Sequence, residues 1–298
     1  MTSLQQYIAE EIATDHVEGL LTRREALRRL ALLGLGSGAA AALITACGAN
    51  QTEKPKGSSR TTGNPPPGMD QALPTEPISW PGPHGELQGA WSQAHNARRG
   101  VLVIHENKGL NNWVRSVAGR FAGAGYSALA IDLLSEEGGT AHFADPAQAT
   151  AALSAIKPDR FIADLNSGIT ELQERVPGGK LAVVGFCFGG GLVWRLLASG
   201  IPELSAAVPF YGPLPDNPDF AGSNPAAVLA FYGALDTRVT GSQAAAKAAL
   251  DRAGLVNDIV VEPNADHAFF NDTGPRYNAA AANDAWRRVL DWFGRYLA

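Results

Sequence analysis

The stretch VVGFCFGGG, residues 183–191, decides the fold of this 298-residue chain. Two β-branched valines run into Gly185, and a cysteine between two phenylalanines is followed by three glycines. An apolar run, a Gly-x-Cys-x-Gly turn and a helical segment at 192–198 predict a strand that enters a helix through a tight turn. Small residues two positions before and after the cysteine allow such a strained turn. Cys187 is therefore interpreted either as a nucleophile or as a small buried side chain that fits a crowded turn.

The segments on both sides of this turn alternate between strand and helix patterns. Short apolar runs predict strands at 100–104, 128–131, 180–184, 206–210, 227–232 and 259–261. Helical spacing predicts helices at 112–124, 146–176, 241–253 and 278–297. An antiparallel hairpin is expected to open the domain, with arms at 78–80 and 86–93. We therefore predict an α/β fold with a mainly parallel sheet and helices on both faces.

Two more strand ends carry residues suited to catalysis. Asp236 follows the predicted strand at 227–232, and His267 follows the one at 259–261. Each has a plainer interpretation, because Asp236 is also typical of a helix N-cap and His267 of a solvated loop. Active sites of open α/β sheets lie beyond the carboxyl ends of the strands. The order nucleophile, acid, base along the chain is that of the α/β-hydrolases, and it favours a Cys187–Asp236–His267 triad.

These residues, together with IHENKGLN at 104–111, resemble the dienelactone hydrolase (carboxymethylenebutenolidase) family of the α/β-hydrolase superfamily. The resemblance runs from about residue 85 to the C-terminus. It implies that Glu106 contacts the resting thiol of Cys187. It also implies that the backbone N–H groups of Asn107 and Phe188 form the oxyanion hole. No cofactor or metal is implied.

The expected activity is hydrolysis of a carboxylic ester or lactone through a thioester acyl-enzyme. Family members that cleave dienelactone hold its carboxylate with arginines. Glu136 stands at one of those positions, and residues 268–271 read AFFN without a cation. Neutral, modest-sized esters or lactones are therefore expected to be preferred over dienelactone, in a largely apolar pocket. The alternatives are an acyltransferase with the same triad and a non-catalytic binding lipoprotein on the same fold.

Residues 1–47 are expected to be an export signal and not part of the folded domain. Arg23 and Arg24 precede an uncharged run at 31–46, which resembles a twin-arginine signal. The run ends ITAC, which resembles a lipoprotein processing site with Cys47 as the lipidated residue. Residues 48–76 are rich in Pro, Gly, Ser and Thr and predict a flexible linker. The hydrolase domain is then 77–298, in a bacterial protein held at the cell envelope by its anchor.

The composition excludes several other classes of protein. The formal net charge is −5 without a basic block, which argues against nucleic-acid binding. Two cysteines cannot supply a disulfide framework, and no Cys/His cluster has the spacing of a zinc site. The expected ligand is a small ester or lactone, the expected membrane contact is the N-terminal anchor alone, and nothing in the pattern sets the oligomeric state.

Overall fold

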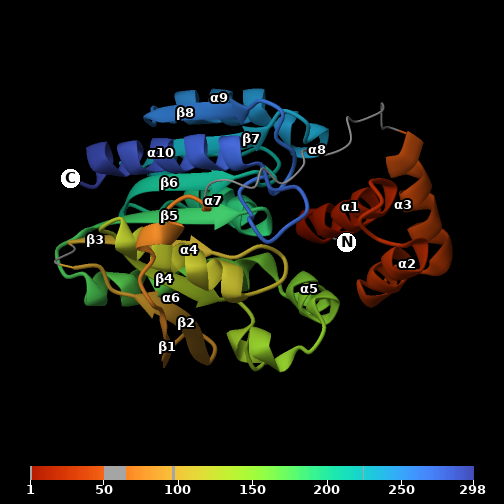
Figure 1. The fold of residues 1–298 in the computed structure, drawn as a ribbon, viewed down its shortest axis with the longest axis horizontal. Coiled ribbons are helices and arrows are strands. Elements are labelled where there is room, and N and C mark those ends of the chain that lie inside the picture. The colour runs from red at the N-terminus through yellow and green to blue at the C-terminus, as the bar shows by residue number, and fades with distance from the viewer. Residues whose placement is uncertain (1, 50–64, 96–97, 224) are drawn as a thin grey trace.

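The fold is built on one eight-stranded sheet (Figure 1). The computed structural model describes residues 2–49, 65–95, 98–223 and 225–298. The strands lie in the order β1-β2-β4-β3-β5-β6-β7-β8, with β2 antiparallel to both β1 and β4 and all other neighbours parallel. The strands are β1 (Glu76–Pro81), β2 (Glu86–Ser92), β3 (Arg99–Ile104), β4 (Ser127–Asp132), β5 (Lys180–Phe186), β6 (Leu204–Phe210), β7 (Ala227–Gly233) and β8 (Asn257–Glu262). The predicted mainly parallel sheet and its opening hairpin are confirmed.

Helices cover both faces of the sheet, as predicted. On one face α4 packs on α10 through the rings of Phe121 and Trp286, and on the other α6 packs on α7 (Figure 1). The helices of this domain are α4 (Asn112–Gly123), α5 (Pro146–Ala155), α6 (Pro158–Arg175), α7 (Phe188–Ser199), α8 (Thr237–Thr240), α9 (Gln243–Arg252) and α10 (Ala279–Tyr296). Between these layers the inner parallel strands β3, β5, β6 and β7 are almost wholly buried. This explains their nearly continuous apolar sequences.

Three further helices stand against the carboxyl ends of the strands, beside α5 and α8 (Figure 1). They are α1 (Ser3–Val17), α2 (Arg23–Leu32) and α3 (Ser37–Ala49), and α1 contacts both of the others. Leu4, Ile8 and Ile12 of α1 are buried at helical spacing, and Thr2 begins the helix with a capping box. The described part of the N-terminal region is therefore folded.

The N-terminal helices also bond to the catalytic domain. Ser3 accepts a hydrogen bond from Arg195 at 2.7 Å, and Gln5 donates to the Ser154 carbonyl at 2.7 Å. On α2, Arg28 pairs with Asp145 at the start of α5. The structure differs here from the expectation that residues 1–47 stay outside the fold, because α1 has an apolar face and charges that match the domain.

The predicted linker and anchor are tested only in part. Residues 50–64 of the linker lie outside the described residues. Residues 65–75 contact α4, where Leu73 N–H donates to the Gly119 carbonyl at 2.9 Å, so this end of the expected linker is docked. Among the described helices, none is both long and apolar enough to cross a bilayer. The division at residues 47 and 77, and the lipid anchor, stay predictions.

Candidate active site

Cys187 lies at the apex of a strained turn between β5 and α7. Its φ angle is 56°, a left-handed conformation that few non-glycine residues adopt. The backbone comes so close to itself that a Cβ on Gly185 would lie 2.2 Å from the Gly189 carbonyl oxygen. Cys187 N–H donates to the Phe210 carbonyl at 3.0 Å, which fixes the turn to the next strand. The predicted strained turn from strand to helix at Cys187 is therefore present.

Asp236 and His267 meet beside this turn. Asp236 follows β7 and His267 follows β8, and the Nδ1 of His267 lies 2.6 Å from Asp236 Oδ2. Burial would raise the pKa of Asp236, but the charge and hydrogen bond of His267 outweigh it and lower this pKa to about 2. Because an ionised carboxylate only accepts, Nδ1 carries the proton and Nε2 faces the turn. Asp236 is also the N-cap of α8, so the alternative prediction that it begins a helix is confirmed as well.

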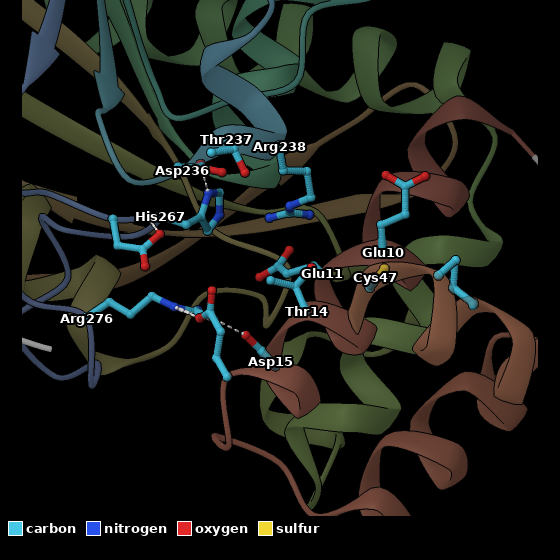
Figure 2. A pocket seen from close by; sticks show the side chains of 14 residues that line it. Glu10, Glu11, Thr14, Asp15, Cys47, Asp236, Thr237, Arg238, His267 and Arg276 are labelled. Carbon is cyan, nitrogen blue, oxygen red and sulfur yellow. Dashed lines mark hydrogen bonds and ion pairs between the residues drawn. The ribbon is translucent and has the colours of Figure 1, made fainter. Parts of the chain in front are cut away.

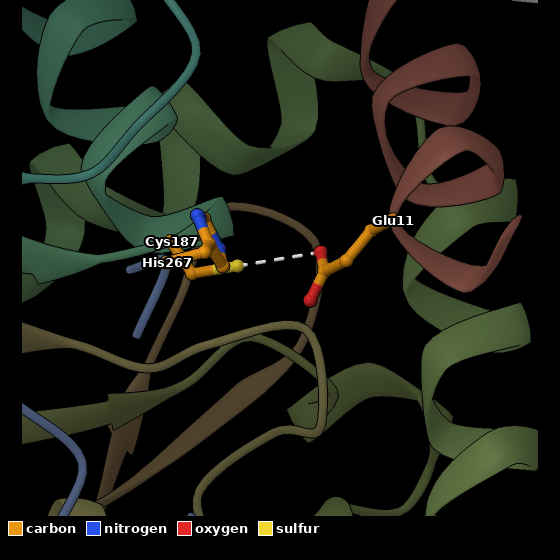
Figure 3. A group of neighbouring side chains, drawn as sticks. All are labelled: Glu11, Cys187 and His267. Atoms are coloured by element: carbon orange, nitrogen blue, oxygen red, sulfur yellow. Dashed lines mark hydrogen bonds between the residues drawn. The ribbon is translucent and has the colours of Figure 1, made fainter. Parts of the chain in front are cut away.

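Two side chains of α1 reach the same point, which the sequence analysis did not anticipate. The Tyr7 hydroxyl lies 3.4 Å from Cys187 Sγ and 3.2 Å from His267 Nε2. Glu11 places a carboxylate oxygen 3.4 Å from the same sulfur, and Asn107 donates to that oxygen at 3.1 Å (Figure 3). Tyr7 and Glu11 are one helical turn apart, so a single face of α1 covers the thiol.

The cover changes the chemistry of the thiol. Burial, followed by the negative charges of Glu11 and Glu106, raises the pKa of Cys187 well above its ordinary value. Desolvation opposes ionisation of the half-buried Glu11 carboxyl, but the charges of His267, Arg238 and Lys108 outweigh it and lower the pKa, so the carboxylate accepts from the thiol as an anion. With α1 in place, Cys187 is held as a protonated thiol.

Among the described residues the thiol makes no hydrogen bond to Glu106, the residue that the resemblance places against it. Asn271 donates to Glu106 Oε2 at 2.8 Å, and the sulfur bonds to Glu11. Burial raises the pKa of Glu106, which Lys108 and Asn271 only partly oppose. Glu106 lies two residues after β3, and in its ionised form its negative charge contributes to the raised pKa of Cys187.

The residues expected to form the oxyanion hole lie at the site. Phe188 is the first residue of α7, so its N–H belongs to the helical turn that has no intrahelical acceptor. Asn107 lies in the loop after β3 and touches Glu11 with its side chain. His105, in the same loop, accepts from Leu133 N–H through Nε2 and faces the Glu106 carbonyl through Nδ1. Both ring nitrogens of His105 therefore make contacts that hold the loop in place.

A cavity of about 380 Å³ opens between the N-terminal helices and the catalytic loops (Figure 2). Two cations stand at its wall. Arg276 binds Asp15 at 2.7 Å and Glu18 at 2.8 Å, and Arg238 lies over the Tyr7 ring at 4.6 Å. The lining comprises Glu10, Glu11, Thr14, Asp15, Glu18, Leu43, Ala46, Cys47, Asp236, Thr237, Arg238, Asp266, His267 and Arg276.

The phenylalanines near the triad do not line this cavity, in contrast to the expectation from the sequence. They are buried in the core, where their rings pack against one another or against neighbouring rings (Phe186, Phe188, Phe269 and Phe270). Glu136 is not at the cavity either, because it pairs with Arg160 at 3.3 Å. The lining residues are mostly polar because they come from loops and from the charged face of α1.

Glu11, Cys187 and His267 are also the only described set of three donor side chains close enough to share a metal ion. Their donor atoms lie within 4.8 Å of one another. The Tyr7 hydroxyl already bonds to both the sulfur and the imidazole, and His267 is paired with Asp236. These contacts account for the three groups without an ion, so we assign them no metal role.

The site residues that sequence reasoning missed fall into two kinds. Arg238, two positions after Asp236, and Tyr211, whose ring lies 5.1 Å from that of His267, belong to the catalytic loops. Both residues lie close to strand ends, and this position in the sequence could have indicated that they belong to the site. Tyr7 and Glu11 precede the export-like segment, and no local pattern links them to a site that lies 180 residues further on.

Comparison with known proteins finds a matching family and curated relatives. Residues 87–297 match the family described as "Dienelactone hydrolase family". The "Putative carboxymethylenebutenolidase" of Escherichia coli O157:H7 is 37% identical over 209 residues, which are 66% of this chain and 76% of that protein.

Solved structures with a similar fold include proteins described as dienelactone hydrolase or dienelactone hydrolase-like. The "Putative Dienelactone Hydrolase" of Klebsiella pneumoniae superposes with a TM-score of 0.66 at 30% identity, over 74% of this chain and 98% of that chain. A dienelactone hydrolase-like promiscuous phosphotriesterase from metagenomic libraries also gives 0.66, at 26% identity over 76% of this chain and 100% of that chain. The matched family region begins at residue 87, after the N-terminal helices.

Proposed function

Because the chain belongs to the dienelactone hydrolase family and is a hydrolase, we propose that Cys187, His267 and Asp236 form its catalytic triad. The observation that carries the proposal is the 2.6 Å contact between His267 Nδ1 and Asp236 beside the strained turn of Cys187. That contact fixes the imidazole with Nε2 toward the thiol side, as a general base requires.

The reaction we propose begins when His267 Nε2 takes the thiol proton and the Cys187 sulfur attacks an ester or lactone carbonyl. The backbone N–H groups of Asn107 and Phe188 stabilise the oxyanion. His267 then protonates the departing alcohol oxygen, which leaves a thioester on Cys187. A water molecule, deprotonated by His267, hydrolyses the thioester and restores the thiol.

A test of this triad is replacement of either reacting side chain in the full chain. Cys187→Ala and His267→Ala should each lower kcat/KM on a panel of activated esters and lactones by about 10³-fold or more. Thr240→Ala, outside the triad, is the matched control for a substitution in the same region. If His267→Ala keeps most of the activity, the assignment of the base is wrong.

For the substrate we propose a neutral ester or lactone of modest size. One of the two positions at which arginines hold the carboxylate of dienelactone carries Glu136, and residues 268–271 supply no cation at the other. Arg276 and Arg238 bind α1 in the closed chain, and they are the cations that would hold a carboxylate if this preference is wrong. The measurement compares kcat/KM for a lactone acid and its methyl ester. Preference for the methyl ester supports the proposal, and a clear preference for the acid would contradict it.

We also propose that the protein is exported and lipid-anchored at Cys47. Arg23 and Arg24 are exposed at the start of α2, where an export receptor could reach them, and Cys47 is half-buried on α3. Changing both arginines to lysine should leave unprocessed protein in the cytoplasm, whereas Cys47→Ala should abolish only lipidation. Normal processing and membrane attachment of the double-lysine variant would contradict the twin-arginine route.

A further inference from the structure

We propose that α1 is an intramolecular cover that closes the active site, so that the full chain turns over substrate only when α1 moves away. The proposal rests on the proposed function in one respect, namely that Cys187 is the nucleophile. Three observations carry it: where the Tyr7 hydroxyl sits, how the protons of the site are shared, and which residues the cavity reaches.

The Tyr7 hydroxyl occupies the place where the substrate has to react. A scissile carbonyl carbon must approach Cys187 Sγ while its leaving oxygen comes within reach of His267 Nε2. The hydroxyl lies 3.4 Å from the sulfur and 3.2 Å from the nitrogen, between these two atoms. An ester cannot enter this position until Tyr7 leaves it.

The protons of the covered site are also arranged against catalysis. The ionised Glu11 carboxylate accepts from the thiol, so the thiol proton points to α1 and not to His267. When the imidazole is neutral, its Nε2 accepts from the Tyr7 hydroxyl, and the base is therefore occupied as well. Cys187 and His267 therefore each bond to a side chain of α1, and the thiol does not donate to the imidazole.

The cavity beside the site stops short of the nucleophile. It is lined by His267 and Asp236 on one side and by Glu11 on the other, but Cys187 is not among its lining residues (Figure 2). Only 2% of Cys187 is exposed, and Glu11 reaches from α1 to its sulfur (Figure 3). A ligand in this cavity would touch the base without reaching the sulfur.

Contacts away from the reacting atoms hold the cover in place. Ile12 is buried beside Ala147 and Thr150 of α5, and Asp15 and Glu18 pair with Arg276. These contacts involve neither Cys187 nor the triad, so docking can be weakened without altering the catalytic groups. Cleavage of the chain before Cys47 would also remove the cover, because it would separate α1, α2 and most of α3 from the domain.

Two kinds of full-chain variant test the cover. Ile12→Asp places a charge in the buried contact with α5, and Asp15→Asn combined with Glu18→Gln removes the ion pairs with Arg276. Gln6→Asp is the matched control, because it adds the same charge to an exposed position of the same helix. Circular dichroism and thermal unfolding identify any variant whose catalytic domain has lost its fold, and the milder ion-pair variant then carries the test.

Two readouts separate the cover from the hydrolase activity. The first is the rate at which iodoacetamide alkylates Cys187, resolved from Cys47 by peptide mass spectrometry. The second is kcat/KM for an activated ester. We expect both to rise by about tenfold or more in Ile12→Asp, to rise less in the ion-pair variant, and to stay unchanged in Gln6→Asp, because turnover follows the fraction of open molecules.

Other outcomes have distinct meanings. Unchanged alkylation in both docking variants would overturn the cover. Faster alkylation with hydrolysis below that of the wild type, in a folded variant, would also overturn it, because α1 would then be part of the working site. Faster alkylation without hydrolysis of any ester, in the wild type or the variants, would support the cover and contradict the proposed function.

Discussion

The nucleophile turn and the N-terminal helices depend on their sequences in different ways. In the turn, a Cβ on Gly185 or Gly189 would lie 2.2 or 2.6 Å from backbone oxygens, so only glycine fits at either position. In the N-terminal region, a Cβ on Gly36 or Gly38 would have no neighbour within 4 Å. The turn is fixed by close backbone packing, whereas the N-terminal helices rest on apolar contacts and ion pairs that many sequences could supply.

The largest effect that separates the two regions is expected at the triad acid. Asp236→Asn should lower kcat/KM by about 10³- to 10⁴-fold, because the amide no longer holds the proton on His267 Nδ1 or stabilises the imidazolium. The alkylation rate of Cys187 should change far less than this, because α1 and not Asp236 controls access to the sulfur. Steady-state kinetics and peptide-resolved alkylation measure the two quantities. If Asp236→Asn lowered kcat/KM and the alkylation rate by the same factor, the triad and α1 would not act independently.

A second difference concerns the glycines. Gly185→Ala should destabilise the catalytic domain by about 1–3 kcal/mol or more, because the methyl group would collide with the Gly189 carbonyl. Chemical denaturation monitored by tryptophan fluorescence gives this free energy of unfolding. A stability equal to that of the wild type would show that the turn can relax, and would remove the steric reason for the Gly-x-Cys-x-Gly pattern.

The pH dependence of alkylation sharpens the comparison further. Burial and Glu11 both raise the pKa of Cys187, so removing α1 from the site should lower it. The thiolate is the reactive form, and alkylation of the wild type should therefore rise only at alkaline pH. In Ile12→Asp the midpoint of the alkylation profile should move to lower pH. A midpoint that stays the same, or moves to higher pH, would contradict the assigned role of Glu11.

The smallest effect is expected in α3. Gly38→Ala places a methyl group in open space within a helix, where alanine is favoured over glycine by about 0.5–1 kcal/mol. The variant should therefore be slightly more stable or unchanged, in contrast to Gly185→Ala. Thermal unfolding followed by circular dichroism is sufficient to measure the sign. A clear loss of stability would mean that α3 is packed as tightly as the nucleophile turn.

Sequence reasoning succeeded where local chemistry decides the structure. The strands, most helices of the domain and the turn at Cys187 follow from apolar runs, helical spacing and glycine positions, and lie close to their predicted bounds. The section predicted as helical at 146–176 is instead divided into α5 and α6, because Pro158 begins a second helix. The pairing of Asp236 with His267 was predictable because both follow strands of a parallel sheet, whose carboxyl ends share one edge.

Prediction failed where contacts join distant parts of the chain. The packing of α3 on α1 was not predicted, because the uncharged run before Cys47 was interpreted only as an export signal, an assignment that stays a prediction. Composition does not reveal such packing, because an export signal and a packed helix both need small and apolar side chains. The contact of Glu11 with the thiol replaced the one expected from Glu106, and it depends on how α1 docks, which no local pattern encodes.

The most direct test of the central claim is to trap the acyl-enzyme. The wild-type chain and Ile12→Asp are mixed with a slowly deacylating activated ester, quenched in acid, and digested for mass spectrometry. The expected result is a single acyl group, labile to hydroxylamine as a thioester is, on the peptide that contains Cys187, and faster acylation in Ile12→Asp. An acyl group on another residue, or ester hydrolysis that persists in Cys187→Ala without any adduct, would contradict it.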